Sequence, residues 1–147
     1  MKQFDRSKSI QQLEGDDWDE PTFHAHLVRE CHRLRRVPLC DFTAENLRIM
    51  IGQNIGLEYL VPLALERLQA EPYAEGDLYP GDLLVNVLRS DMEFWQRRPE
   101  LRQQLVAIAE RATGPSKILP ANVDETEVGY IADAYAEFKR QRTPVRG

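Results

Sequence analysis

The sequence predicts an all-α fold, a single-domain bundle of about five to six short helices. Apolar residues recur three and four positions apart in successive segments, which is the spacing that places side chains on one face of an α-helix. Most prolines and glycines fall between those segments, where they begin or end helices. No stretch alternates apolar and polar residues as a half-buried strand would.

The N-terminal half begins with Ile10 and Leu13, which predict a short helix before Gly15. The next helix follows Pro21 and ends before Pro38, whose ring disfavours the helical conformation of the preceding residue. Thr43 is the predicted N-cap of another helix. The helix after that contains Pro62, which can be accommodated if it lies in the first turn. Each helix after the first of these four has a predicted buried stripe. The stripes are, in order, Phe23, Leu27, Cys31 and Leu34; Leu47, Met50 and Ile51; and Leu57, Leu60, Val61, Ala64, Leu65 and Leu68.

The C-terminal half predicts three further helices and a helical turn over residues 91–98. Pro80 opens the first, with Asp82 in its first turn, where a carboxylate favours the helix dipole. Pro99 opens the second. The predicted buried stripes are Leu83, Leu84, Val87 and Leu88, then Leu101, Leu105, Ile108 and Ala112, and then Val128, Ile131, Ala132, Tyr135 and Phe138. We expect residues 1–140 to form the single domain and residues 141–147 to be a flexible C-terminal tail.

Composition excludes several function classes. The chain has 147 residues, with 19 Lys and Arg against 24 Asp and Glu, so its net charge of −5 disfavours nucleic-acid binding by counterion release. Its longest apolar run, residues 60–65, is far shorter than the roughly 20 residues that a membrane span needs. Residues 1–6 lack the apolar region of a signal peptide. We therefore expect a cytoplasmic protein that binds neither nucleic acid nor membrane.

The histidines and cysteines, which could serve as metal ligands, are few. They are His24, His26, His32, Cys31 and Cys40. Residues two apart point in different directions on a helix, and the chain contains neither a CxxC nor an HExxH motif. Two free thiols are favoured over a Cys31–Cys40 bridge. We therefore expect no catalytic residues, no metal and no cofactor. The alternative is a metal-dependent enzyme or regulator that uses this cluster.

Residues 71–82 carry the clearest candidate for a binding site. This segment combines four carboxylates with two tyrosines, which can anchor a partner while the carboxylates attract a basic one. Residues 16–20 repeat the mixture around Trp18. The candidate binding residues are Glu71, Tyr73, Glu75, Asp77, Tyr79 and Asp82, assisted by Asp16, Asp17 and Asp19. The alternative is a solvated loop whose tyrosines fold back on the core, with Trp18 as a lid over it.

Two long sequence strings, one of which overlaps this segment, resemble a known family. IGQNIGL at residues 51–57 and EGDLYPGDLL at residues 75–84 are similar to immunity proteins of contact-dependent growth inhibition (CDI) systems. Residues 13–18, 31–39 and 94–101 fit the same resemblance, which covers about residues 9–110. The last forty residues add nothing recognisable to it.

The resemblance implies a bacterial, non-enzymatic protein that binds the C-terminal toxin domain of a cognate CDI effector and protects the producing cell. Many such toxins are nucleases with basic substrate grooves, so an acidic immunity protein would suit them physically. A helical adaptor in a larger complex is a further alternative.

Overall fold

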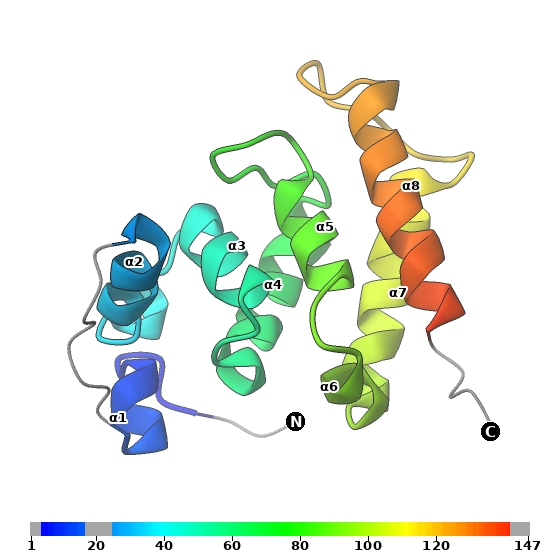
Figure 1. Ribbon diagram of the computed structural model, residues 1–147. Helices are drawn as coiled ribbons and strands as arrows, with labels where there is room; N and C mark the ends of the chain where they lie inside the picture. The colour runs from blue at the N-terminus through cyan, green and yellow to red at the C-terminus, as the bar shows by residue number, and fades with distance from the viewer. Residues whose placement is uncertain (1–3, 17–24, 142–147) are drawn as a thin grey trace.

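The computed structural model describes residues 4–16 and 25–141, which form helices joined by loops (Figure 1). The all-α prediction is confirmed, since these residues contain no strand and only an isolated bridge between Glu75 and Pro80. The helices are α1 (Ile10–Glu14), α2 (His26–Leu34), α3 (Ala44–Gly52), α4 (Leu57–Ala70), α5 (Asp82–Leu88), α6 (Met92–Gln96), α7 (Pro99–Thr113) and α8 (Glu125–Arg140), with a 3-10 turn η1 (Leu39–Asp41) before α3. None of the described helices is both long and apolar enough to cross a bilayer.

The number of helices exceeds the prediction. The described residues contain eight α-helices rather than five to six. The two additional helices are α1 and α6, which are five residues long and which the sequence predicts only as a short helix and a helical turn beside the longer helices.

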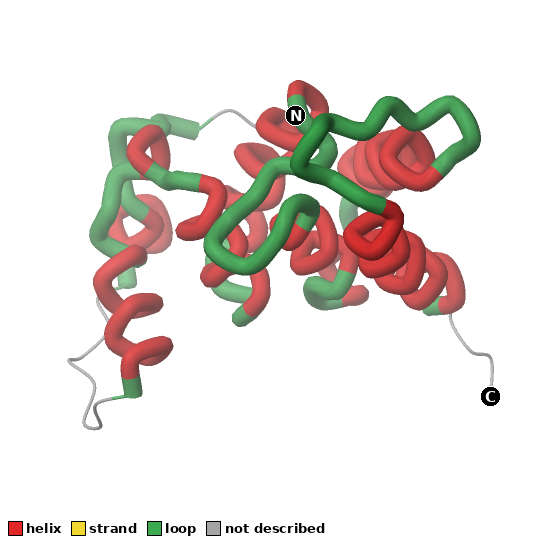
Figure 2. Tube along the Cα trace, turned by 90° about the horizontal axis from the view of Figure 1, so that it is seen from above, coloured by secondary structure: helices red, strands yellow, loops and turns green. Residues whose placement is uncertain are grey.

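The helices pack in two layers. In one layer α2, α3, α5 and α8 follow side by side, and α4 and α7 cover them from behind (Figure 1). Seen from above, the loops before α5 and before α8 lie over the same end of the molecule (Figure 2). This end carries the candidate site.

Local signals set most helix starts. Thr43 Oγ1 accepts a hydrogen bond from the N–H of Asn46 at 3.1 Å, and the Asn46 side chain accepts one from the N–H of Thr43, so the predicted N-cap is confirmed. Gly56 precedes α4 at φ +64°. A Cβ there would lie 2.7 Å from Cδ1 of Ile10, so the positive φ and this close contact together favour glycine at this position.

Two prolines lie elsewhere than expected. Pro62 is the sixth residue of α4, not part of its first turn, and it is buried. Its ring therefore removes one backbone hydrogen bond from the interior of the helix. Helix α5 begins at Asp82 instead of Pro80, because Gly81 adopts φ +92°, which a helix cannot continue through. The placement of Asp82 in the first turn is confirmed.

The buried faces follow the predicted stripes with two exceptions. Leu27 of α2 is 43% exposed. In α8, Ala132 is exposed and Ala134 is buried instead, because the positions of α5 and α7 determine which side of α8 faces inward. Phe23 lies outside the described residues. One core cluster contains residues from Ile10 to Phe138. At its centre Trp95 packs edge-on against Phe138 and donates its indole N–H to Ser90 Oγ at 2.8 Å. The proposed domain limits stay a prediction, and residues 142–147 of the expected tail lie outside the described residues.

Candidate functional site

The acidic loop, residues 71–82, connects α4 to α5 and closes on itself through its backbone. The N–H of Ala74 bonds the carbonyl of Glu71 at 3.1 Å, and the N–H of Gly81 bonds the carbonyl of Tyr73 at 3.1 Å. The bridge between Glu75 and Pro80 brings the two sides of the loop together. The backbone therefore has a defined shape rather than that of a loose connection.

Asp82 holds this shape from inside. Its side chain is fully buried, and its carboxylate accepts hydrogen bonds from the N–H groups of Gly76 at 2.7 Å, Leu78 at 3.0 Å and Tyr79 at 3.4 Å. Arg48 Nε from α3 lies 3.8 Å from the same carboxylate. A buried charge is stable when it is hydrogen-bonded and paired in this way.

A second carboxylate supports the loop from α3. Glu45 Oε1 accepts hydrogen bonds from the N–H of Asp77 at 2.8 Å and from Arg48 Nε at 2.6 Å. The hydrogen bond from Arg48 lowers the pKa of Glu45 more strongly than burial raises it, so this carboxylate stays ionised at neutral pH. A Cβ at Gly76 would lie 2.5 Å from Glu45 Oε1, so glycine lets the loop approach this close.

Tyr73 ties the loop to the second layer. Its ring is 5% exposed, and its hydroxyl donates to the backbone carbonyl of Ala112 in α7 at 2.7 Å. Burial raises the pKa of this phenol. Of the six candidate residues in the loop, Tyr73 and Asp82 therefore lie inside the protein, and their direct role is to position the others.

The other four candidate residues of the loop lie at least partly at the surface. Glu71, Glu75 and Asp77 are exposed, and Tyr79 is half-buried. The ring of Tyr79 packs against Tyr130 of α8 with 4.9 Å between centroids. Burial, followed by the nearby charge of Asp82, raises the pKa of Tyr79. The loop thus presents three carboxylates and one aromatic edge on a braced backbone.

Asp16, the described residue of the second acidic segment, lies away from this surface. Asp16 is exposed, and its backbone carbonyl accepts a hydrogen bond from Arg35 at 2.8 Å. It follows α1, which lies along a different edge of the molecule from the acidic loop (Figure 1). Asp17, Trp18 and Asp19 lie outside the described residues.

The described histidines and cysteines differ in their exposure. His26 and Cys40 are exposed, whereas His32 and Cys31 are buried. Both thiols are free, as predicted, and burial raises the pKa of Cys31. The part of the chain that the structure describes brings together no three His, Cys, Asp or Glu side chains that could hold a metal. His24 lies outside the described residues.

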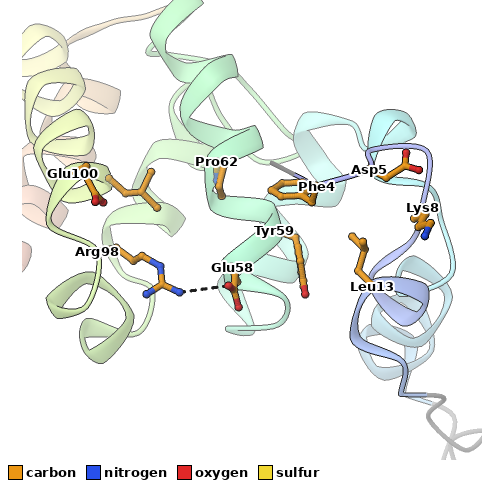
Figure 3. Close-up of a pocket in the computed structure, with 10 residues that line it drawn as sticks. Phe4, Asp5, Lys8, Leu13, Glu58, Tyr59, Pro62, Arg98 and Glu100 are labelled. Carbon is orange, nitrogen blue, oxygen red and sulfur yellow. Dashed lines mark ion pairs between the residues drawn. The ribbon is translucent and has the colours of Figure 1, made fainter. Parts of the chain in front are cut away.

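A groove of about 590 Å³ lies between α1 and its preceding segment, α4 and the start of α7 (Figure 3). Phe4 packs edge-on against Tyr59 at 5.4 Å on one side of it. On the other side Arg98 lies 3.6 Å from the Glu58 carboxylate. Asp5, Lys8 and Glu100 also line the groove, so its wall combines charged side chains with apolar ones.

A comparison with family models decides which proteins this chain is related to. A model described as CDI immunity proteins matches residues 12–105, well over half of the chain. The chain belongs to the family of CDI immunity proteins. The resemblance of residues 9–110 is thereby confirmed, and membership in the family implies a protein that neutralises a toxin. Neither a curated protein nor a solved structure shows significant similarity to the chain.

Sequence reasoning missed several residues of the candidate site. Glu45 and Arg48 support the acidic loop from α3, Leu78 is exposed within the loop, and Tyr130 of α8 is exposed beside it. The spacing of Glu45 and Arg48, three apart on one helix, does predict their mutual ion pair. No local pattern could reveal that both reach a loop thirty residues further along the chain.

Proposed function

We propose that this immunity protein binds the C-terminal toxin domain of a cognate CDI effector inside the producing bacterium and neutralises it there. The match of residues 12–105 to the family carries this proposal. Neutralisation requires a stable complex and no chemistry of the immunity protein's own. The metal-enzyme alternative gains no support from the described residues, among which no three His, Cys, Asp or Glu side chains form a group that could hold a metal.

The exposed part of the acidic loop is the surface that we assign to the toxin. Glu71, Glu75 and Asp77 would attract a basic partner, and Tyr79 would supply an aromatic contact. Tyr73 and Asp82 would contribute indirectly, because their buried hydrogen bonds fix the loop that carries these side chains. A loop that is already ordered loses little entropy on binding, which favours affinity. Asp16, Asp17 and Asp19 remain a separate, secondary candidate.

Co-expression tests the proposal. The toxin domain encoded by the neighbouring reading frame is expressed in a susceptible bacterium with and without this protein. We expect the immunity protein to restore growth, and a variant with Glu71→Gln, Glu75→Gln and Asp77→Asn to restore it less. A toxin domain from an unrelated system serves as the control, which this protein should not neutralise. Growth arrest despite good expression of both proteins would refute the proposed function.

A further inference from the structure

The acidic loop and α8 share a surface patch of large apolar side chains, formed by the half-buried Tyr79, its exposed sequence neighbour Leu78 and the exposed Tyr130. Leu78 is 61% exposed and Tyr130 is 44% exposed, and the rings of Tyr79 and Tyr130 pack at 60° to each other. Large apolar side chains that gather on a surface mark a contact site more often than scattered ones do. Tyrosine is especially common at the centres of protein interfaces.

Both segments that meet at this patch are acidic. Residues 71–82 contain four carboxylates and no Lys or Arg, and residues 124–134 repeat this composition. Asp133 is exposed one turn beyond Tyr130 on the same side of α8. The nearby cations are already paired: Arg48 with Glu45, Arg89 with Glu137 at 3.2 Å, and Lys117 with Glu125 at 3.6 Å. The surroundings of the patch therefore suit a partner that brings its own positive charge.

The two halves of the patch are held against each other. Helix α5, which follows the acidic loop, packs on α8. Gly81 approaches α8 so closely that a Cβ there would lie 2.8 Å from Cδ1 of Ile131. Ile131 is the neighbour of Tyr130 in sequence and is fully buried. The spacing between loop and helix is therefore fixed before any partner binds.

We propose that the first half of α8, residues 125–134, completes the toxin-binding surface, with Tyr130 at its centre and Asp133 beside it. This inference rests on the proposed function. The occupant is a basic surface of the toxin domain whose Arg or Lys side chains stack on the tyrosine rings and pair with the surrounding carboxylates. Because the family match ends at residue 105, this half of the surface lies outside the shared segment and determines which toxin is recognised.

Binding measurements with purified proteins test the inference. The probe is the toxin domain from the neighbouring reading frame, carrying an inactivated catalytic residue, and the full-length immunity protein is the binder. We expect Tyr130→Ala to raise Kd at least tenfold, mainly through faster dissociation, and Tyr130→Phe to remain close to the unmodified protein. Asp133→Asn should slow association at low salt and flatten its dependence on ionic strength.

Two matched controls lie far from the patch. Leu27→Ala removes an apolar side chain of α2 that is 43% exposed, nearly the same fraction as Tyr130. Glu100→Gln removes an exposed carboxylate at the start of α7. Both should bind like the unmodified protein. Thermal unfolding of Tyr130→Ala checks its fold, and Asp133→Lys provides a second disruption on an exposed side chain with no core contact to lose.

The outcomes separate the inference from the function on which it rests. An unmodified protein that fails to bind the toxin domain would refute the proposed function itself. An unmodified protein that binds, together with Tyr130→Ala, Asp133→Asn and Asp133→Lys variants that bind equally well, would overturn the role of α8 alone.

Discussion

At the scale of single residues, Asp82 organises the acidic loop. A carboxylate at the first position of a helix is favourable because it faces the positive end of the helix dipole. Here the same carboxylate also accepts hydrogen bonds from three backbone N–H groups of the preceding loop. Replacing a buried acceptor leaves its donors without partners, which costs more than the hydrogen bonds contribute in net terms.

Asp82→Asn should lower the free energy of unfolding by about 2–3 kcal/mol, because hydrogen bonds to charged acceptors are worth about that much. The NH₂ group of asparagine is itself a donor, so it could not accept the hydrogen bonds that the backbone N–H groups donate to Asp82. Urea denaturation measures the loss, and hydrogen exchange should show faster exchange at the amides of Gly76, Leu78 and Tyr79. Asp77→Asn is the control, since its exposed side chain takes no part in this network, and it should change stability by less than about 0.5 kcal/mol. Equal stability of the two variants would contradict the role of Asp82.

At the scale of elements, two glycines show how α8 meets its surroundings. Gly129 lies inside α8, and a Cβ added there would find no atom within 4 Å. Gly81 precedes α5 at φ +92° and lies against Ile131 of α8. The first glycine only weakens its helix, whereas the second permits both a left-handed turn and the close approach of α8.

Alanine substitutions at these glycines should therefore have opposite effects. Gly129→Ala should stabilise the protein by about 0.5–1 kcal/mol, because alanine loses less conformational freedom in a helix. Gly81→Ala should destabilise it by about 1–3 kcal/mol through backbone strain and the clash with Ile131. Chemical denaturation of both variants checks the two signs. A stabilising Gly81→Ala would mean that the approach of α8 to this turn is not tight.

At the scale of the whole molecule, the family match ends at residue 105, in the middle of α7. The core does not end there. Trp95 packs on Phe138 of α8, and Tyr73 bonds the carbonyl of Ala112 in the second half of α7. We therefore propose that residues 1–140 fold as one unit, of which the family segment is only a part.

A chain of residues 1–105 should fail to unfold cooperatively, because losing α8 exposes Trp95 and the apolar face of α5. Circular dichroism and urea denaturation would show reduced helix and a broad transition. A chain of residues 1–141 is the control and should unfold like the full-length protein. A sharp transition for residues 1–105 would show that the family segment is an independent domain.

Helices of nine or more residues were mostly accessible to sequence reasoning. Thr43 predicts the start of α3, and the stripe from Leu57 to Leu68 predicts the buried face of α4. These signals are local, since caps and helical periods involve residues within a few positions of each other. Helices α1 and α6 are five residues long, so the sequence indicates them only as a short helix and a helical turn. The exposure of Leu27 also depends on neighbours that its own helix does not specify.

The candidate site, too, was only partly predictable from the sequence. Composition alone identifies residues 71–82 as an acidic, aromatic segment, and the strings around it indicate the CDI immunity family. Composition does not indicate that Asp82 and Tyr73 point inward or that Tyr79 meets Tyr130. The burial of Asp82 and Tyr73 and the contact between Tyr79 and Tyr130 depend on where α3, α7 and α8 pack. These helices are distant in sequence, and they supply the groups that pair the buried polar atoms and cover the rings. Local chemistry thus predicts which residue types the surface contains, and long-range packing decides which of them reach it.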